Sequence, residues 1–262
     1  METKYIVIKF GGHTMTNPAL RDAFVQDLAP IAAGGRRCVV VHGGGPQISS
    51  LLERLSIESH FEQGLRVTDE PAMQAVEMAL SAQVNKELVS ALTAHGVPAC
   101  GISGRDGAPL LQAKVRSPKF GRVGDVTAVH PELLSCLVQN GFVPVVSPIA
   151  EDEQGGGALN INADTAAGAV AGALQAEFFV LMSDVPGVLD ADKKLLPELT
   201  RAQIQELKDS GVINGGMIPK VDSCLHALDM GCQKALILNG GEKSALRRLL
   251  EGDTSLGTVV LA

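Results

Sequence analysis

Short runs of β-branched and other apolar residues alternate along this chain with amphipathic stretches long enough to form helices. An apolar run bounded by turn residues predicts a buried strand, and apolar positions three or four residues apart predict a helix packed against it. Repeated alternation of the two patterns is typical of a largely parallel sheet with helices on its faces. The predicted strands cover residues 5–8, 37–41, 142–147, 178–182 and 235–238.

Helix starts and turns refine this prediction. Pro18, Pro131 and Asp164 each stand where a helix start is expected, with Asp164 directly ahead of an alanine-rich run. Residues 101–127 contain Gly and Asp turns between short alternating segments, which predicts hairpins inserted at a sheet edge. We therefore predict an α/β fold, a three-layer αβα sandwich with a mostly parallel central sheet and a small β-hairpin insertion.

The length of 262 residues fits one α/β domain, residues 1–262, built around one continuous sheet. The polar and glycine-rich stretch EDEQGGG is the best candidate for a boundary inside it. We place this boundary near residues 149–157, which predicts an N-terminal lobe of about 1–150 and a C-terminal lobe of about 151–262.

Composition and charge narrow the class of protein. With 45% hydrophobic and 19% charged residues, the chain is expected to fold with a large core. Its apolar runs are strand-length, shorter than the ~20 residues of a membrane span, and the start of the sequence leaves no room for a signal peptide. We expect a cytoplasmic protein. The net charge of −7 argues against a nucleic-acid partner.

The five cysteines, Cys38, Cys100, Cys136, Cys224 and Cys232, are scattered along the sequence and include no CxxC pair. Zinc and redox sites commonly use such pairs. We therefore predict five buried, reduced thiols and no metal site built from protein ligands.

Glycine-rich segments follow three of the predicted strands, where open α/β sheets bind their ligands. They read KFGG from Lys9, HGGG from His42 and SDVPGVLD from Ser183. Glycines allow the backbone to approach an anion closely and to present N–H groups to it. A tight strand-to-helix turn is the alternative interpretation of each segment alone, but two neighbouring glycine loops, one with a lysine, favour a binding site.

A carboxylate and a second lysine complete the candidate chemistry. Asp164 lies in LNINADTAA and Lys220 in GGMIPK, and together with Lys9 they suit phosphate transfer. Because the whole chain is acidic, an anionic ligand requires a local positive pocket, for which Lys9, Arg66 and Lys220 are candidates. Neither GxxxxGK[ST] nor GxGxxG occurs, which argues against Walker-type and Rossmann dinucleotide sites.

These segments together resemble the amino acid kinase family, from Tyr5 nearly to the carboxyl terminus. GLRVTD at residues 64–69, combined with NINAD, resembles the branch of the family that phosphorylates N-acetyl-L-glutamate in arginine biosynthesis. The resemblance implies the amino acid kinase fold and transfer of the γ-phosphoryl group of ATP to the side-chain carboxylate of N-acetyl-L-glutamate. The segments that carry it are KFGG, VHGGGPQI, GLRVTD, SGRDG, GRVGDV, LNINADTAA, SDVPGVLD and GGMIPK.

The resemblance also implies roles for individual residues. Lys9 and Lys220 would stabilise the transferring phosphoryl group, and Asp164 would organise both ammonium groups. The implied substrate-binding residues are Gly44, Gly45, Arg66 and Asn160. The implied ATP-binding residues are Gly11, Gly12, Ser183, Asp184, Val185, Pro186, Gly187, Val188, Leu189, Val212, Ile213 and Asn214.

Further expectations follow from this resemblance. Mg²⁺ would bridge the ATP phosphates without dedicated protein ligands, and an already ionised carboxylate would need no general base. The N-terminal lobe would bind the acyl substrate and dimerise, and the C-terminal lobe would bind ATP. Because the first strand starts close to Met1 and the carboxyl-terminal stretch lacks Asp-Gly-Arg, we expect a homodimer that arginine does not inhibit.

Two alternatives to this function stay open at this stage. A carrier-protein-linked glutamate or aminoadipate would use the same chemistry, although Gln63 ahead of GLRVTD favours the free acetylated amino acid. A catalytically inactive ligand sensor would not need Lys9, Asp164 and Lys220 together. The histidines that we interpret as structural or solvated are His13, His60, His95, His130 and His226.

Overall fold

The central sheet of the protein has eight strands, as seen in a computed structural model that describes residues 4–11 and 13–261. Neighbouring strands are parallel except for one antiparallel pair, β13 with β14. The order across the sheet is β12 (Glu198–Thr200), β14 (Gly257–Leu261), β13 (Lys234–Asn239), β11 (Phe178–Ser183), β1 (Tyr5–Phe10), β2 (Arg37–His42), β8 (Val143–Ser147) and β5 (Ala99–Ser103).

The apolar strands divide their side chains between two cores. In β1, Ile6 and Ile8 contribute to one cluster of buried residues, whereas Val7 contributes to another. Successive side chains of a strand point to opposite faces, so both faces of the sheet must be covered. Lys9, two residues after Val7, consequently points to the same face as Val7.

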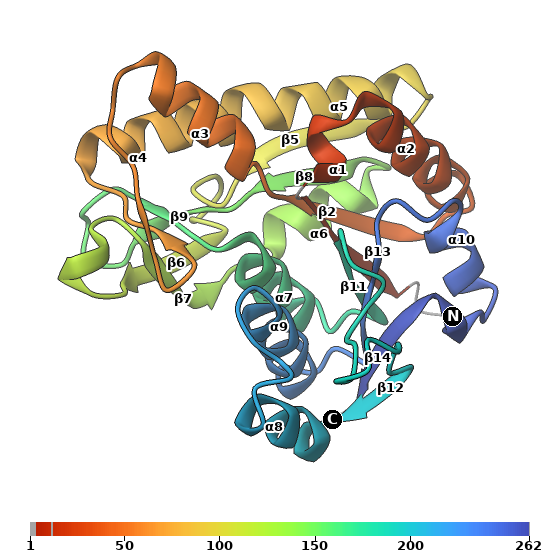
Figure 1. The fold of residues 1–262 in the computed structure, drawn as a ribbon. Helices are drawn as coiled ribbons and strands as arrows, with labels where there is room; N and C mark the ends of the chain where they lie inside the picture. Colours follow the sequence, from red (N-terminus) through yellow and green to blue (C-terminus); the bar gives the residue numbers. More distant parts are fainter. Residues whose placement is uncertain (1–3, 12, 262) are drawn as a thin grey trace.

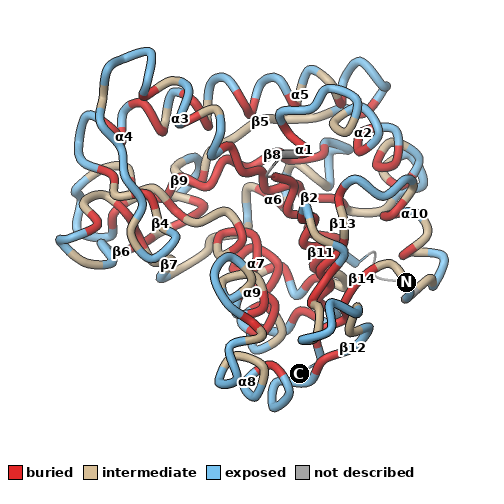
Figure 2. The backbone as a smooth tube through the Cα atoms, viewed as in Figure 1, coloured by how far each residue is buried: buried red, intermediate tan, exposed pale blue. Residues whose placement is uncertain are grey.

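Helices cover both faces and complete the predicted three-layer αβα sandwich (Figure 1). The sheet itself is the buried centre of the molecule (Figure 2). One layer contains α1 (His13–Thr16), α2 (Pro18–Ala33), α5 (Asn85–Ala94) and α10 (Ala245–Leu250). The other layer contains α6 (Glu132–Gln139), α7 (Ala163–Ala173), α8 (Arg201–Asp209) and α9 (Met217–Asp229).

A second sheet extends the fold beside the main one. Its antiparallel pair β6 and β7 is the predicted hairpin insertion, and β9 and β10 enlarge it to four strands. The order is β10 (Ala158–Asn160), β9 (Ile149–Asp152), β6 (Leu111–Val115) and β7 (Gly124–Val129). The expected lobe boundary at residues 149–157 therefore forms β9 and the turn that leads to β10.

Several small elements complete the fold. A short hairpin of β3 (Phe61–Glu62) and β4 (Leu65–Arg66) lies between α3 (Gly45–Arg54) and α4 (Glu70–Glu77). A π-helical segment, η1 (Met78–Val84), joins α4 to α5 without a break. Two single turns of 3-10 helix are η2 (Pro118–Phe120) and η3 (Thr254–Leu256).

All five predicted strands are present, and the structure adds strands that the pattern did not indicate. The edge strand β5 reads ACGIS and is only half buried, so it lacks the apolar run that marks the inner strands. The predicted helix starts agree to within two residues. The α2 helix begins at Pro18, and α7 begins at Ala163, where the side-chain oxygen of Asn162 accepts bonds from the N–H groups of Asp164 and Thr165.

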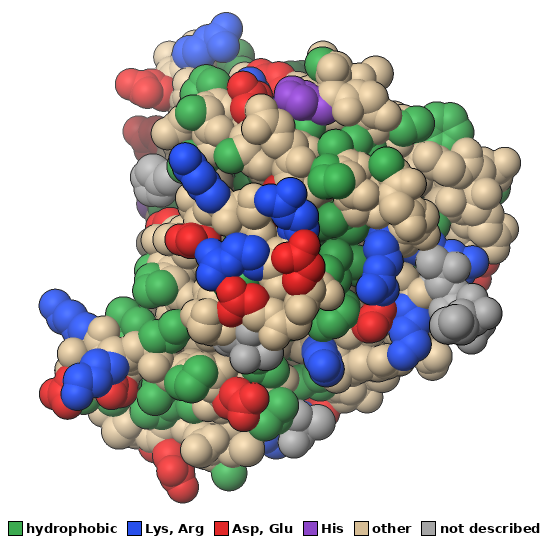
Figure 3. Space-filling model, turned by 90° about the vertical axis from the view of Figure 1, so that its right-hand side faces the viewer, with side chains coloured by type: hydrophobic (Ala, Val, Ile, Leu, Met, Phe, Trp, Pro, Cys, Tyr) green, Lys and Arg blue, Asp and Glu red, His purple; other side chains and the backbone are tan. Residues whose placement is uncertain are grey.

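The surface carries both signs of charge. On the face shown in Figure 3, basic and acidic side chains lie close to one another, so neighbouring charges partly compensate. In the part of the chain that the structure describes, no helix has both the length and the apolar character needed to cross a bilayer.

The prediction that all five cysteines are buried is wrong. Cys38, Cys224 and Cys232 are buried, but Cys100 is partly exposed and Cys136, on the outer side of α6, is exposed. All five are free thiols. Burial raises the pKa of Cys38 to about 12 and that of Cys232 to about 11, so these two thiols stay protonated at neutral pH.

Brief treatment with iodoacetamide at neutral pH is expected to modify Cys136 fastest and Cys100 more slowly, because only an accessible thiolate reacts. The three buried cysteines should react only after unfolding. Peptide mass spectrometry over time measures this order, with Cys136→Ser as the matched control. Fast labelling of Cys38 in the folded protein would contradict the expected order.

Candidate active site

The candidate residues meet at the carboxyl ends of three adjacent parallel strands. Phe10 of β1 is paired with His42 of β2, and Lys9 is paired with Leu181 of β11. Because parallel strands end at one edge of a sheet, the loops that follow β1, β2 and β11 lie side by side. This edge is where the sequence predicted the glycine-rich segments to gather.

A buried aspartate links the two predicted lysines. The Nζ atom of Lys9 lies 2.9 Å from Oδ1 of Asp164, and that of Lys220 lies 2.9 Å from Oδ2. Lys9 comes from β1, Asp164 from the first turn of α7 and Lys220 from α9. The small residues of α7 allow α9 to pack closely, since a Cβ atom at Gly168 would lie 2.7 Å from the carbonyl oxygen of Ser223.

The charges in this cluster determine the protonation state of Asp164. Burial acts to raise the pKa of Asp164, but the ammonium groups of Lys9 and Lys220 outweigh it and hold the pKa below its usual value of 3.8. Asp164 is therefore ionised at neutral pH. Two positive groups held by one carboxylate carry one net positive charge, and one of the two, Lys9, lines a pocket.

The pocket beside Lys9 has a volume of about 260 Å³. The N-terminal end of α3 opens into it, and helix N-termini attract anions. Its walls are partly apolar. The structure brings five predicted residues to its lining, namely Lys9, Gly44, Gly45, Arg66 and Asn160.

Arg66 provides the second positive group of the pocket. Its guanidinium donates to Ser59 Oγ at 2.6 Å, to Ser49 Oγ at 2.7 Å and to the carbonyl oxygen of Gly45 at 3.2 Å. It also lies over the ring of Phe61, 4.6 Å from its centre. These partners are uncharged, so they orient the guanidinium without neutralising it, and it remains able to bind a carboxylate.

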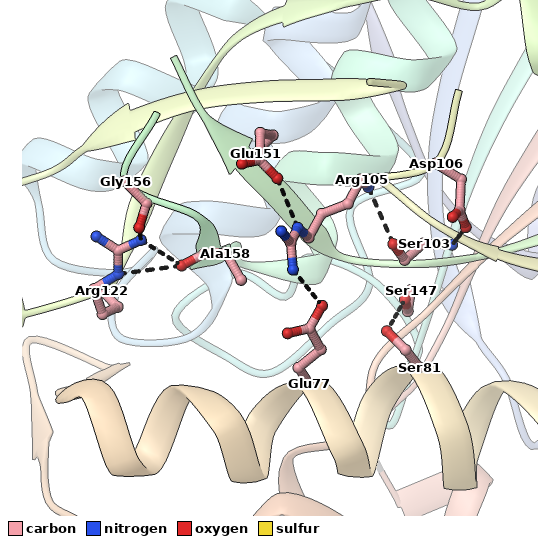
Figure 4. Close-up of polar contacts among 10 residues, drawn as sticks. All are labelled: Glu77, Ser81, Ser103, Arg105, Asp106, Arg122, Ser147, Glu151, Gly156 and Ala158. Atoms are coloured by element: carbon pink, nitrogen blue, oxygen red, sulfur yellow. Dashed lines mark hydrogen bonds and ion pairs between the residues drawn. The ribbon is translucent and has the colours of Figure 1, made fainter. Parts of the chain in front are cut away.

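Asn160 is oriented by a buried threonine that the sequence analysis did not identify. The hydroxyl of Thr68 donates to the carbonyl oxygen of Arg66 at 2.8 Å and accepts from Nδ2 of Asn160 at 3.1 Å. Arg122 supports the same strand, because its side chain donates to the carbonyl oxygens of Ala158 and Gly156 (Figure 4). The Asn160 N–H also donates to the Arg122 carbonyl oxygen at 2.8 Å.

Further polar contacts connect the helical wall of the pocket to the strands. Arg105 donates to Glu77 of α4 at 2.9 Å and to Glu151 of β9 at 2.7 Å (Figure 4). The hydroxyl oxygens of Ser81 in η1 and Ser147 at the end of β8 are 2.8 Å apart. These contacts join elements that are far apart in the sequence, which is why local patterns did not indicate them.

The predicted ATP-binding segments lie outside the lining of this pocket. Residues 183–189 end β11 and follow it, and residues 212–214 precede α9, which carries Lys220. The side chains of Val188 and Ile213 are buried in the core, so only their backbone could face a nucleotide. Gly11 adjoins Lys9, with its Cβ position 2.9 Å from Lys9 Nζ. Gly12 lies outside the described residues.

His42, at the start of the second glycine loop, has no role in the sequence-based prediction of the site. It is fully buried between Gly43 and Asn85, with bonds to both. Burial lowers the pKa of His42 to about 4, so its imidazole is neutral at physiological pH.

The depressed pKa of His42 predicts loss of stability in mild acid. An unfolded histidine titrates near 6.5, so between pH 6.5 and about 4 the unfolded chain binds a proton that the folded chain does not. The free energy of unfolding should therefore fall as pH decreases through this window, by about 3 kcal/mol in total. Urea unfolding of the natural protein and of His42→Asn at several pH values isolates the contribution of His42 to the free energy of unfolding. If that free energy depends on pH in the same way in both proteins, His42 makes no such contribution.

Comparison with known proteins shows the family to which the chain belongs. The profile of the Amino acid kinase family matches residues 4–239, which is most of the chain. This chain therefore belongs to the amino acid kinase family. Its mostly parallel central sheet with helices on both faces agrees with this assignment.

Within the family, the chain is similar to acetylglutamate kinases over nearly its whole length. It is 43% identical to the acetylglutamate kinase of Nitratidesulfovibrio vulgaris, with 98% of this chain and 87% of the relative aligned. It is also 43% identical to that of Brucella canis, with 99% and 92% aligned. The crystal structure of smu.665 from Streptococcus mutans matches with a TM-score of 0.85 and 31% identity, covering 98% of each chain.

Proposed function

We propose that this protein phosphorylates the side-chain carboxylate of N-acetyl-L-glutamate with ATP, forming N-acetyl-L-glutamyl 5-phosphate in arginine biosynthesis. The observation that carries the proposal is a pocket lined by both Lys9 and Arg66, in which Lys9 is paired with Asp164 and, through it, with Lys220 outside the lining. A dicarboxylate substrate has two negative groups, and the pocket offers two positive ones, from Lys9 and Arg66. The acetylglutamate kinases at 43% identity support the choice of acyl group.

In this mechanism an oxygen of the substrate carboxylate attacks the γ-phosphorus of ATP directly, the bond between that phosphorus and the β–γ bridging oxygen breaks, and ADP leaves. Such a carboxylate is ionised at neutral pH, so no residue has to remove a proton from it. The main task of the protein is to position the reactants and to stabilise the negative charge on the transferring group. The ammonium groups of Lys9 and Lys220 would stabilise that charge, and Asp164 would keep both groups aligned.

The remaining contacts would orient the acyl substrate. Arg66 would bind the α-carboxylate through its fork of donors, and Asn160 would hold the α-substituents. The backbone N–H groups of Gly44 and Gly45 would donate to carboxylate oxygen at the N-terminal end of α3. Four of the five predicted residues in the pocket lining precede position 150, which supports binding of the acyl substrate by the N-terminal lobe.

ATP would lie along residues 183–189 and 212–214 of the C-terminal lobe. A divalent metal would bind here through the ATP phosphates and not through Asp164, because both oxygens of Asp164 are paired with lysines. No group of three or more His, Cys, Asp or Glu side chains suited to a metal occurs among residues 4–11 and 13–261. We propose Mg²⁺, which binds through phosphates and water and would neutralise phosphate charge.

The test of this function is ATP-dependent formation of an acyl phosphate, trapped with hydroxylamine. N-acetyl-L-glutamate should react far better than glutamate, aspartate or N-acetyl-aminoadipate, because the pocket pairs two positive ends with an apolar wall. Turnover of a carrier-linked substrate alone would instead support the first alternative. A folded protein that binds ATP but turns over none of them would overturn the assignment as a kinase.

We further propose a cytoplasmic homodimer that arginine does not inhibit. The edge strand β5 has a neighbour on only one side within the described chain, and Met78 of the adjoining η1 is exposed, which supports association at this edge. Free cysteines are usual in a reducing compartment. Light scattering should give twice the 27.3 kDa chain mass, and 5 mM arginine should leave activity unchanged. A hexamer or strong inhibition would contradict this proposal.

A further inference from the structure

His42 is buried next to the pocket but has no part in the mechanism described above. It is the last residue of β2 and directly precedes the glycines that line the pocket. None of its side-chain surface is exposed to solvent. A buried imidazole at this position must therefore satisfy both ring nitrogens within the protein.

A chain of hydrogen bonds determines which nitrogen of His42 carries the proton. Lys86 Nζ donates to Oδ1 of Asn85 at 3.1 Å, and an ammonium group can only donate. Nδ2 of Asn85 therefore faces the protein, where it donates to the carbonyl oxygen of Val145 at 2.8 Å and lies 3.2 Å from Nε2 of His42 and 3.3 Å from the carbonyl oxygen of Ile102. Because Nδ2 can only donate, Nε2 accepts and the proton of the neutral ring is on Nδ1.

Gly101 allows this chain of hydrogen bonds to form. A Cβ atom at this position of β5 would lie 1.9 Å from Oδ1 of Asn85 and 2.7 Å from Nζ of Lys86. Lys86 also donates to the carbonyl oxygen of Gly101 at 2.8 Å, which holds the ammonium group over the strand. The orientation of Asn85 is thus determined from outside the pocket.

The proton on Nδ1 in turn orients the glycine loop. Nδ1 lies 2.8 Å from the carbonyl oxygen of Gly43 and donates to it. In a trans peptide the C=O and the following N–H point in opposite directions, so the N–H of Gly44 points away from His42. The Gly43 N–H donates to the carbonyl oxygen of Phe10 at 2.8 Å, which holds the preceding peptide.

Packing holds the loop in this orientation at the Lys9 end of the pocket. The Cβ position of Gly11 lies 2.9 Å from Lys9 Nζ and 3.3 Å from Gly43 N, so Lys9 and the loop both approach Gly11 where a side chain would stand. Behind the loop, Leu80 of η1 fills the space where a Cβ of Gly44 would be, at 2.5 Å. Val84 of η1 also lies beside this position, at 3.2 Å, and Asn85 directly follows it in the chain.

We propose that His42 is a positioning residue: Asn85 and Lys86 hold it as the Nδ1–H tautomer, and it orients the Gly43–Gly44 peptide so that the Gly44 N–H donates to the substrate carboxylate. This inference rests on the proposed function for the identity of the substrate. The depressed pKa of His42 agrees with it, because a neutral ring is required for Nε2 to accept.

Two substitutions of His42 separate positioning from packing. His42→Asn keeps a nitrogen donor where Nδ1 lies, whereas His42→Gln is closer in size but places its donor where Nε2 lies. We expect His42→Gln to lower kcat/KM for N-acetyl-L-glutamate about 30-fold and His42→Asn to stay within about threefold of the natural protein. KM for ATP should not change in either variant. Equal losses in both variants would show that the ring only fills space.

The tautomer itself is measured on the unmodified protein with selectively ¹⁵N-labelled histidine. Two-bond ¹⁵N–¹H correlation spectra at pH 7 should show His42 as Nδ1–H, with its signals identified by their absence from His42→Asn. An Nε2–H tautomer would overturn the proposal without any activity measurement.

The link to the substrate is measured separately from the tautomer. Addition of N-acetyl-L-glutamate should shift the backbone amide signal of Gly44 downfield in the natural protein and much less in His42→Gln. An unmoved Gly44 signal in natural protein that turns over acetylglutamate would overturn the positioning role. Absence of turnover with an observed Nδ1–H tautomer would place the failure in the proposed function instead.

Discussion

Lys220→Ala is expected to lower kcat for acetylglutamate phosphorylation about 10³-fold while leaving KM for N-acetyl-L-glutamate within about threefold. The ammonium group is held 2.9 Å from Asp164 and lies outside the lining of the acyl pocket, so its loss should affect the transferring phosphoryl group more than substrate binding. Removal of one preorganised charge of this kind typically costs 10²–10³ in rate. Steady-state kinetics with hydroxylamine trapping measures both parameters.

The matched control for this change is Lys208→Ala. Lys208 is on α8 and pairs with Asp222 of α9, the helix that carries Lys220. The substitution therefore also removes a lysine and its ion pair to a carboxylate, but away from the reacting groups. Its kcat should stay within about twofold. If Lys220→Ala kept full activity, or if Lys208→Ala lost as much, the assignment of Lys220 to the phosphoryl group would be wrong.

Asp164→Asn is expected to reduce both activity and stability. The carboxylate is buried and holds two ammonium groups, so a neutral amide would leave both lysines without their counter-charge. Removing one partner of a buried ion pair lowers the free energy of unfolding by about 3 kcal/mol or more. We expect kcat to fall about 10³-fold, because neither lysine stays aligned. Urea unfolding and steady-state kinetics measure the two effects.

Asp229→Asn is the control for this second change. Asp229 is exposed near the end of α9 and pairs with Arg201, and exposed pairs contribute about 1 kcal/mol or less. The variant should therefore be nearly as stable and active as the natural protein. A stable Asp164→Asn protein would show that the two lysines do not depend on the carboxylate, and an active one would exclude Asp164 from the mechanism.

The outcome for Arg66 illustrates how far sequence reasoning reached in the site. The resemblance carried by GLRVTD implied a substrate-binding arginine, and the structure puts Arg66 in the pocket lining with Asn160, Gly44 and Gly45. The serines that orient it, Ser49 and Ser59, are 17 and 7 residues away in the chain. Such partners carry no pattern of their own, because a serine that bonds an arginine looks in sequence like any surface serine.

The cysteines and the edge strand show where burial could not be predicted. Cys136 lies in an apolar-looking segment, ELLSCLVQ, but on the outer side of α6, so the residue type gave a wrong expectation of burial. The strand β5 contains Gly101, which weakens the strand pattern. The structure explains this glycine, since Lys86 and Asn85 occupy the space of its missing side chain.

By itself, the sequence determined the class of fold and the inner strands and indicated Lys9, Asp164 and Lys220 as candidates, because apolar periodicity, glycine turns and short motifs are local properties of the chain. Only the tertiary structure decided that Asp164 binds both lysines, that a second sheet orients Asn160, and that His42 contacts Asn85. These contacts join residues 43 to 155 positions apart in the chain (42 to 85 and 9 to 164). Their geometry depends on how helices and sheet pack together, and many packings are compatible with the same local pattern.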